Sequence, residues 1–404
     1  MDVERVRRDF PMLSQRVHGV PLVYLDNAAS THKPTLVIDA IRRVYEQDYS
    51  NIHRGVHELS QRLTMQYEEA REKIRVFLNA RSRAEIVFTY GTTDSINLVA
   101  QTFGRANIGK GDEILISEME HHSNIVPWQL LCEQTGATLK VIPFNDQGNL
   151  AMSDVEALLS ERTKLVALVH VSNALGTINP IGPIIKLAHD AGAKVLVDGA
   201  QAVAHMKTDV QKSDVDFYAF SGHKVFGPTG IGVLYGKEDL LEAMPPWRGG
   251  GDMIRTVTFE KTTYADLPYK FEAGTPNIAG GIGLGAAIDY VHDIGLKHIN
   301  HYENSLLAYM TRQLLNVEWL KIIGNAPCKS GAISFMIEGV HHNDLGQYID
   351  HLGVAIRTGH HCAQPVMQHY GVTGTARASL AFYNNTQDID RFIEALEKAK
   401  KFLL

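Results

Sequence analysis

Cysteine is scarce in this sequence, and charge of one sign does not dominate it. The 404 residues include three cysteines, Cys132, Cys328 and Cys362, a small and odd set that favours reduced thiols in the cytoplasm over a disulfide framework. Lysine and arginine number 39 against 45 aspartates and glutamates, and the net charge of −6 provides no basic field for nucleic acid or an anionic membrane. We therefore expect a cytoplasmic protein with no nucleic-acid partner and no membrane partner.

Long hydrophobic segments are also lacking. The longest uncharged apolar run, residues 278–288, is shorter than the ~20 residues that a membrane-spanning helix needs. The first ten residues, MDVERVRRDF, carry six charges, so we expect no secretory signal there. With 45% hydrophobic and 21% charged residues, the composition is that of a globular protein and excludes wholesale disorder.

Three common motifs of nucleotide and metal sites are absent from the sequence. It contains neither the GxGxxG of dinucleotide-binding folds nor the GxxxxGK[ST] of P-loop nucleotidases. The His-His-Cys run at residues 360–362 resembles part of a zinc site, but a structural zinc site normally has four ligands and no CxxC pair is present. Cys132 and Cys328 are expected in a helix and a linker, so we predict no metal site.

What the sequence does contain is an alternation of short β-branched runs and helical segments from residue 85 to residue 236. The runs are apolar nearly throughout, as strands covered on both faces are; they include EIVFTY, DEILIS, LVALVHVS, AKVLVDG and GIGVLYG. This alternation predicts an α/β fold with a mainly parallel central sheet flanked by helices. After about residue 293 a long helix, shorter strands and a closing helix indicate a smaller α/β domain. We expect a large domain over residues 20–293 and a small domain over residues 294–404. Residues 1–19 are expected to belong to the small domain.

An acid and an amine follow two neighbouring strands of the predicted sheet. Asp198 ends the run in VLVDGAQ, and Lys224 follows the next run in FSGHKVFGPTGIG. Ligands of open α/β sheets bind outside the carboxyl ends of the strands, so both side chains should reach one crevice. One interpretation is a structural ion pair. The other is a pyridoxal phosphate (PLP) site, in which the lysine forms a Schiff base and the acid keeps the pyridine nitrogen protonated.

Further polar groups are expected at the same edge of the sheet. Gly91 and two threonines open a helix whose free N–H groups favour a phosphate, although Thr93 could equally be a plain N-cap. Ser221 and His223 precede Lys224 and add donors. His121 also follows a strand; a surface or metal-binding role is the alternative to stacking on a planar ring and moving protons near neutral pH.

The segment IRTGHHCAQP places one thiol among basic groups. Arg357, His360 and His361 lie within five residues of Cys362 and should stabilise its thiolate, which is the reactive form. Arg377 begins an apolar strand-like run. An arginine there could clamp the carboxylate of an amino acid, or it could form a surface ion pair.

Ten segments together resemble the group II cysteine desulfurases, the SufS/Csd type. The resemblance runs from about residue 10 to the C-terminus and is carried by YLDNAAS, HRGVHELS, GTTDSINLVA, MEHHSNIVPW, HVSNALGT, VDGAQAV, FSGHKVFGPTGIG, PPWRGGGDMI, FEAGTPN and RTGHHCAQP. It implies a class V aminotransferase-like, fold-type I PLP-dependent enzyme that is a homodimer. One departure is Asp94-Ser95, where many relatives have Glu-Gly; the acid is kept but is one methylene shorter.

The resemblance also implies roles for individual residues. Cys362, Lys224 and His121 would be catalytic, with Cys362 accepting the sulfur. The substrate would be engaged by Arg377, at its carboxylate, and by Asn173 and Arg357. The cofactor would be held by Lys224, Asp198, Gln201, His121, Thr93, Ser221, His223 and, from the partner subunit, Thr275.

The activity implied is removal of sulfur from L-cysteine, giving L-alanine and a persulfide on Cys362. A SufE-like acceptor would collect the sulfur, with iron–sulfur cluster assembly as the expected destination. L-selenocysteine is a second candidate substrate. The alternatives are a selenocysteine lyase, another PLP-dependent lyase or transaminase, and a non-catalytic sulfur-relay protein; a thiol hydrolase lacks a clear Cys-His-Asn set.

Overall fold

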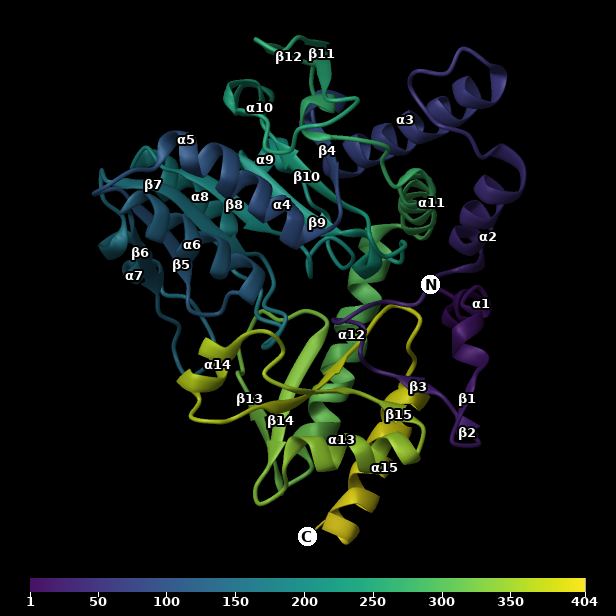
Figure 1. Cartoon of the computed structure of the whole chain (residues 1–404). Helices are drawn as coiled ribbons and strands as arrows, with labels where there is room; N and C mark the ends of the chain where they lie inside the picture. Colours follow the sequence, from purple (N-terminus) through teal and green to yellow (C-terminus); the bar gives the residue numbers. More distant parts are fainter. Residues whose placement is uncertain (404) are drawn as a thin grey trace.

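The computed structural model describes residues 1–403 and is organised around a seven-stranded sheet and a four-stranded sheet (Figure 1). The larger sheet has the strand order β4-β10-β9-β8-β7-β5-β6. Its strands are β4 (Ile86–Thr89), β5 (Glu113–Ser117), β6 (Thr138–Ile142), β7 (Thr163–Val169), β8 (Lys194–Asp198), β9 (Phe217–Ser221) and β10 (Gly232–Gly236). The pairs from β6 to β9 are parallel, and β10 is antiparallel to β9 and β4. The predicted α/β fold with a mainly parallel sheet is confirmed.

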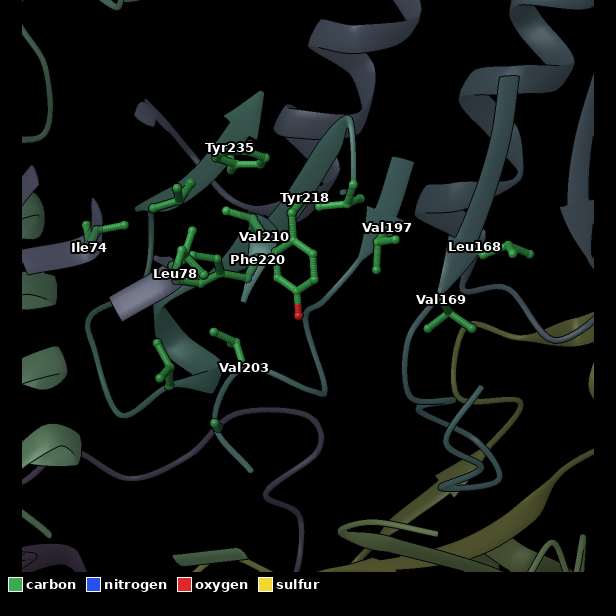
Figure 2. Packing of buried hydrophobic residues seen from close by; sticks show 14 of the residues in the cluster. Ile74, Leu78, Leu168, Val169, Val197, Val203, Val210, Tyr218, Phe220 and Tyr235 are labelled. Carbon is green, nitrogen blue, oxygen red and sulfur yellow. The ribbon is translucent and has the colours of Figure 1, made fainter. Parts of the chain in front are cut away.

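Alternate residues of these strands pack into different hydrophobic clusters, one on each face. In β7, Val166 and Leu168 belong to one cluster, whereas Leu165 and Ala167 belong to the other. Figure 2 shows the first face, where Leu168 belongs to the same cluster as Val197, Tyr218 and Phe220 of the sheet and Ile74 and Leu78 of the covering helix α3 (Glu58–Leu78). Because both faces are covered, the inner strands are apolar nearly throughout, whereas the edge strand β6 is less buried and carries Thr138 and Lys140.

The covering helices are divided between the two faces. The cluster of Figure 2 takes residues from α3 (Glu58–Leu78), α8 (Ile181–Asp190) and α11 (Ile278–Ile294). The opposite cluster takes residues from α4 (Thr92–Val99), α6 (Val126–Thr135) and α10 (Glu238–Ala243). The other helices of this part are α2 (Thr35–Arg43), α5 (Arg105–Asn107), α7 (Met152–Leu158) and α9 (Val210–Ser213). A hairpin of β11 (Ile254–Val257) and β12 (Thr262–Tyr264) projects beyond them (Figure 1).

The smaller sheet is antiparallel, with the order β13-β14-β17-β16. Its strands are β13 (Leu320–Ile323), β14 (Ala332–Ile337), β16 (Arg357–Gly359) and β17 (Thr375–Ser379). It packs with the helices α12 (Leu296–Leu315), α13 (His342–His351) and α15 (Thr386–Leu403), and the short α14 (Gln364–His369) follows β16. Across residues 1–403, no helix combines the length and the apolar character needed to cross a bilayer.

The N-terminal segment contacts the C-terminal part of the chain. Helix α1 (Val3–Arg8) carries Arg7, which donates to Asp388 at 2.7 Å. After the short pair β1 (Arg16–Val17) and β2 (Val20–Pro21), strand β3 (Val23–Tyr24) pairs in parallel with β15 (Val354–Ala355). The segment after β3 therefore enters the space between the two sheets, where the candidate site lies. The exact domain boundaries stay a prediction.

Candidate active site

A cavity of about 210 Å³ lies beyond the carboxyl ends of the parallel strands, facing the smaller sheet. The larger sheet supplies Asp198, at the end of β8, and Lys224, in the turn after β9. The smaller sheet supplies Arg377 from β17 and Arg357 from β16. The lining also includes Ala28, Ala29, Thr92, Thr93, His121, Ser123, Val169, Asn173, Ala200, Gln201, Ser221, His223, His361 and Cys362. The structure thus brings together every predicted site residue except Thr275.

The acid and the amine are each held in an environment that favours the neutral form. Asp198 is buried and accepts the N–H of Ala200 at 3.0 Å. Burial raises the pKa of its carboxyl, against the opposing effects of this hydrogen bond and of the Lys224 charge. Lys224 lines the cavity, and burial lowers its pKa to about 8, with the Asp198 charge opposing the shift. A much larger share of this amine is unprotonated near neutral pH than in an ordinary lysine.

The start of α4 forms an open cradle of donors beside Ser221. Gly91 is the N-cap, with no side-chain cap hydrogen bond and a φ of 152°, a conformation that other residues rarely adopt. Ser221 Oγ accepts the N–H of Thr92 at 2.8 Å and contacts Thr92 Oγ1 at 2.8 Å. The alternative that Thr93 is a plain N-cap is wrong, because the cap is Gly91 and Thr93 lies inside the helix, exposed at the cavity. Free N–H groups at a helix start favour a phosphate.

His121 is fixed by the residues that follow it. Its Nδ1 accepts the N–H of Ser123 at 3.1 Å and contacts the Ser123 hydroxyl at 2.8 Å. An accepting Nδ1 places the proton of the neutral ring on Nε2. Burial lowers the pKa of His121 to about 3, and the Lys224 charge adds to the effect. The ring is therefore neutral across the physiological range.

The segment after β3 closes one side of the cavity. Gln201 Nε2 donates to the carbonyl of Ala28 at 2.7 Å. His223 Nδ1 contacts the hydroxyl of Ser30 at 3.3 Å, and burial lowers the pKa of His223 to about 4. The side chains of Gln201 and His223, both predicted to face the cofactor, are thus held by an N-terminal segment. The motifs that contain these two residues do not indicate that contact.

The loop that carries Cys362 has a constrained backbone. His361 and Cys362 both adopt the left-handed conformation, with φ values of 53° and 55°. This conformation costs a non-glycine residue on the order of 1–3 kcal/mol of folding free energy, and it persists only where surrounding contacts hold it. Here the Asn173 amide donates to the carbonyl of His361 at 2.6 Å, and the N–H of His122 donates to the carbonyl of Cys362 at 2.7 Å. These bonds fix the turn that presents the thiol to the cavity.

One of the basic groups predicted near this thiol, His361, does not supply positive charge. His361 is buried, contacts Thr375 Oγ1 at 2.8 Å through Nε2, and has its pKa strongly lowered by burial. It is neutral near neutral pH, so the expectation that it stabilises the thiolate as a cation is wrong. Arg357, which was also predicted near the thiol, and Arg377 line the cavity together with Cys362, and these two guanidinium groups are the lasting positive charges there.

Arg377 is buried, which excludes the surface ion pair considered from the sequence. Its Nη1 donates to the carbonyl of Asn173 at 2.8 Å and its Nη2 to Asp26 at 3.1 Å. Burial lowers the pKa of Arg377 to about 10, while Asp26 opposes the shift, so the guanidinium stays charged. Within residues 1–403, Arg377 Nε and Asn173 Oδ1 are buried without a hydrogen-bond partner. Buried polar atoms of this kind usually have partners, so this pair is suited to a polar ligand.

Two predicted features lie outside the cavity. Thr275 is exposed and does not line it. Asp94, where relatives have the longer acid, accepts from Arg248 at 2.6 Å and from the N–H of Tyr90 at 3.1 Å, so the shorter side chain still forms an ion pair.

Two contributors were missed from the sequence: Asp26 and Ser123. Asp26 gives no local signal, because its partner Arg377 lies 351 positions away.

The residues present fit PLP. A helix start without a side-chain cap lies beside hydroxyl groups for a phosphate, and an acid, an amine and a neutral imidazole surround the same cavity. The unpartnered donor of Arg377 and acceptor of Asn173 match the carboxylate and amine of an amino acid.

Comparisons with known proteins find similar chains over nearly the whole length of this one. The family model for aminotransferase class-V matches residues 23–392. The cysteine desulfurase of Enterobacter sp. (strain 638) is 54% identical over 402 residues, which cover 99% of each chain. That of Synechococcus elongatus is 53% identical over 397 residues; the match covers 98% of this chain and 63% of that longer protein. Among solved structures, the cysteine desulfurase CsdA (S-sulfonic acid) from Escherichia coli aligns over 100% of both chains with a TM-score of 0.94 and 42% identity.

Proposed function

The chain belongs to the aminotransferase class-V family, and on that premise we propose that it acts as a PLP-dependent cysteine desulfurase. It takes sulfur from L-cysteine, releases L-alanine and leaves a persulfide on Cys362. The observation that carries this proposal is the presence of the Cys362 thiol in the same cavity as Lys224 and Asp198. A transaminase needs the amine and the acid but has no use for the thiol.

PLP, when bound, supplies an electron sink that makes the α-proton of an attached amino acid acidic and its bond to sulfur labile. Lys224 would carry it covalently, and Asp198 would hold its ring nitrogen in the protonated form. Gln201 would contact the ring hydroxyl. The phosphate would be held by the start of α4 and by Thr93, Ser221, His223 and the partner subunit's Thr275.

Arg377 would bind the substrate carboxylate through Nε and the N–H groups not donated to Asp26 and Asn173, and Asn173 and Arg357 would complete the contact. The buried Nε of Arg377 supports this assignment because the substrate gives it a partner. A charged and buried guanidinium favours a carboxylate over an uncharged group.

Proton transfer is best assigned to the Lys224 amine. With a pKa of about 8, this amine can take up and return a proton near neutral pH. His121, whose pKa is about 3, is a poor base and is suited to stacking on the cofactor ring as a neutral group. Its Nε2–H can still donate to a developing negative charge.

Cys362 would act as the sulfur acceptor by attacking the sulfur of the bound cysteine as a thiolate. One S–S bond forms and the C–S bond breaks. The electron pair of the broken bond stays with the carbon skeleton, which takes up a proton to become alanine. The step therefore needs no outside oxidant, and Arg357 and Arg377, which line the cavity together with Cys362, supply positive charge on that side of the sulfur.

The partners belong to the same proposal. The loop around Cys362 is held by Asn173 and His122, which limits how far the persulfide can reach, so a SufE-like acceptor protein has to come to it. The exposed position of Thr275 supports a homodimer in which this residue serves the other subunit. The three cysteines are free thiols, which supports the cytoplasm, and iron–sulfur cluster assembly is the proposed destination of the sulfur.

Product analysis tests this function against the other PLP-dependent reactions. The holoenzyme is incubated with L-cysteine and a reductant, and the organic product is identified. Alanine together with sulfide supports the desulfurase. Pyruvate and ammonia indicate β-elimination and contradict it. The same assay with L-selenocysteine measures the proposed second activity.

A further inference from the structure

We propose that His122, His360 and Cys362 form a binding site for a thiophilic divalent cation of the zinc or cadmium type, and that the bound cation blocks the thiol. Each of the three residues offers one ligand atom, and these atoms lie within 4.8 Å of one another. A thiolate and two imidazoles are a donor set that such cations prefer. The site was not expected from the sequence, because His122 comes from a distant segment.

A backbone hydrogen bond holds the segment of His122 against the loop of Cys362. The N–H of His122 donates to the carbonyl of Cys362 at 2.7 Å, and the N–H of Gln364 donates to His122 Nε2 at 3.1 Å. The imidazole of His122 is therefore fixed against the loop that carries the thiol, and its ring centroid lies 5.5 Å from that of His360. The backbone bond between His122 and Cys362 keeps the two segments together even when an ion displaces the contact at His122 Nε2.

The lone pairs of both rings point toward the same loop. His360 Nδ1 accepts the N–H of Cys362 at 3.0 Å, just as His122 Nε2 accepts that of Gln364. An accepting ring nitrogen is unprotonated and can bind a metal. The cation would take the place of these two amide protons, which lie at the surface and can bond to water instead. The thiol releases its proton when it becomes a ligand.

The size of the cluster suits a zinc-like ion after a small contraction. Bond lengths of about 2.0–2.3 Å in a tetrahedral site put neighbouring ligand atoms about 3.4–3.6 Å apart. The donors therefore have to approach by about 1 Å, and the exposed side chain of His360 is free to move that far. Three protein ligands leave a fourth position open to water, as in catalytic zinc sites.

The proposed ion lies outside the cofactor cavity. Cys362 lines the cavity, whereas His122 and His360 do not. Arg357 and Arg377 line the cavity together with Cys362 and repel a metal ion on that inner side. A bound cation should therefore occupy the outer side, remove the thiolate from the reaction and leave the cofactor undisturbed.

The test is a titration of the holoenzyme with Cd²⁺, in a Cys328→Ala background that removes the exposed thiol of that residue. Equilibrium dialysis with element analysis gives the bound cadmium, and ultraviolet absorption reports the thiolate–cadmium bond. We expect one ion per chain, an absorption that is lost in Cys362→Ala, and at least ~tenfold weaker binding in His122→Asn and in His360→Asn. His301→Asn, which changes an exposed histidine far from the cluster in the sequence, should bind like the parent.

Two further readouts separate this site from other thiol effects. Saturating Cd²⁺ should slow alkylation of Cys362 by at least ~tenfold, measured by mass spectrometry, and should leave the visible PLP absorption unchanged. The proposal is overturned if both histidine variants bind Cd²⁺ as tightly as the parent, if the ultraviolet band persists in Cys362→Ala, or if the PLP absorption shifts. An unchanged PLP absorption in each metal-free variant shows that it is folded, and no part of the test requires turnover.

Discussion

The guanidinium of Arg377 donates to a carboxylate oxygen of Asp26 at 3.1 Å, and this ion pair joins β17 of the smaller sheet to the segment that follows β3. Asp26 is partly exposed while Arg377 is buried. Burial lowers the pKa of Arg377 and the Asp26 charge opposes that shift, so the acid keeps the guanidinium charged and oriented. Asp26 is thus a positioning residue for the proposed carboxylate contact.

Replacement of this acid should weaken substrate binding. Asp26→Asn removes a charged hydrogen bond, and such bonds are worth about 1.5–3 kcal/mol, or about 10–150-fold in an equilibrium constant. We expect the KM for L-cysteine to rise by at least ~tenfold with a smaller change in kcat, as measured by steady-state alanine formation. Asp39→Asn, an exposed acid paired with Arg42, is the matched control and should leave KM unchanged. An unaltered KM in Asp26→Asn would remove this role from Asp26.

The lowered pKa of Lys224 predicts how cofactor loading depends on pH. Only the unprotonated amine reacts with PLP, so the rate rises as pH increases through the pKa. For a pKa of about 8, the reactive share is about a tenth at pH 7 and about nine-tenths at pH 9. We expect the rate of reconstitution of the apoprotein, followed by visible absorption, to level off near pH 9. A rate that keeps rising toward pH 10 would indicate an ordinary lysine.

Lys224→Ala serves as the control for the loading experiment. It should abolish the visible absorption of covalently held PLP, while Lys33→Ala should retain it. Lys33 is another lysine with a lowered pKa, about 8, and its amine donates to the carbonyl of His223 at 3.0 Å. Covalent attachment that survives in Lys224→Ala would contradict the assignment.

Asp198→Asn should separate cofactor binding from catalysis. An amide has nearly the shape of the acid but cannot keep the pyridine nitrogen protonated, so the electron sink weakens. Loss of charge complementary to a transition state typically costs about 3–4 kcal/mol, which corresponds to a kcat lower by about 10²–10³-fold. The variant should still bind PLP, as its visible absorption would show. A kcat within threefold of the parent would exclude this role.

The three thiols should differ sharply in function. Cys362→Ala should keep the visible PLP absorption and lose persulfide formation, because the thiol lines the cavity but does not hold the cofactor. Cys328→Ala, which removes an exposed thiol, should transfer sulfur normally. Cys132 is packed against a hydrophobic cluster and burial raises its pKa, so it should stay unmodified. Sulfur found on Cys328 or Cys132 in the parent enzyme would contradict the account.

The sequence predicts those site residues that lie at the end of a strand or directly after it. Asp198 ends β8 and Lys224 lies in the turn after the neighbouring parallel strand β9, so sheet geometry brings them to one edge. The apolar runs predicted the mainly parallel sheet for a similar reason, since strands covered on both faces are apolar throughout.

The remaining parts depend on contacts that no local pattern encodes. Arg377 allowed two interpretations until its burial and its contact with Asp26 were known. His361 was wrongly expected to be a cation, because its burial follows from packing against Thr375 in the smaller sheet. His122 follows a strand of the larger sheet and Cys362 follows a strand of the smaller sheet. Their contact therefore becomes visible only in the folded structure.

The most direct test is the mass of the peptide that contains Cys362 after one turnover. The holoenzyme is mixed with an equal amount of L-cysteine, alkylated at once, digested and analysed by mass spectrometry. The account predicts that this peptide gains one sulfur atom, that alanine forms in equal amount, and that the peptides of Cys132 and Cys328 gain none. Alanine or sulfide produced while Cys362 stays an unmodified thiol throughout would contradict it.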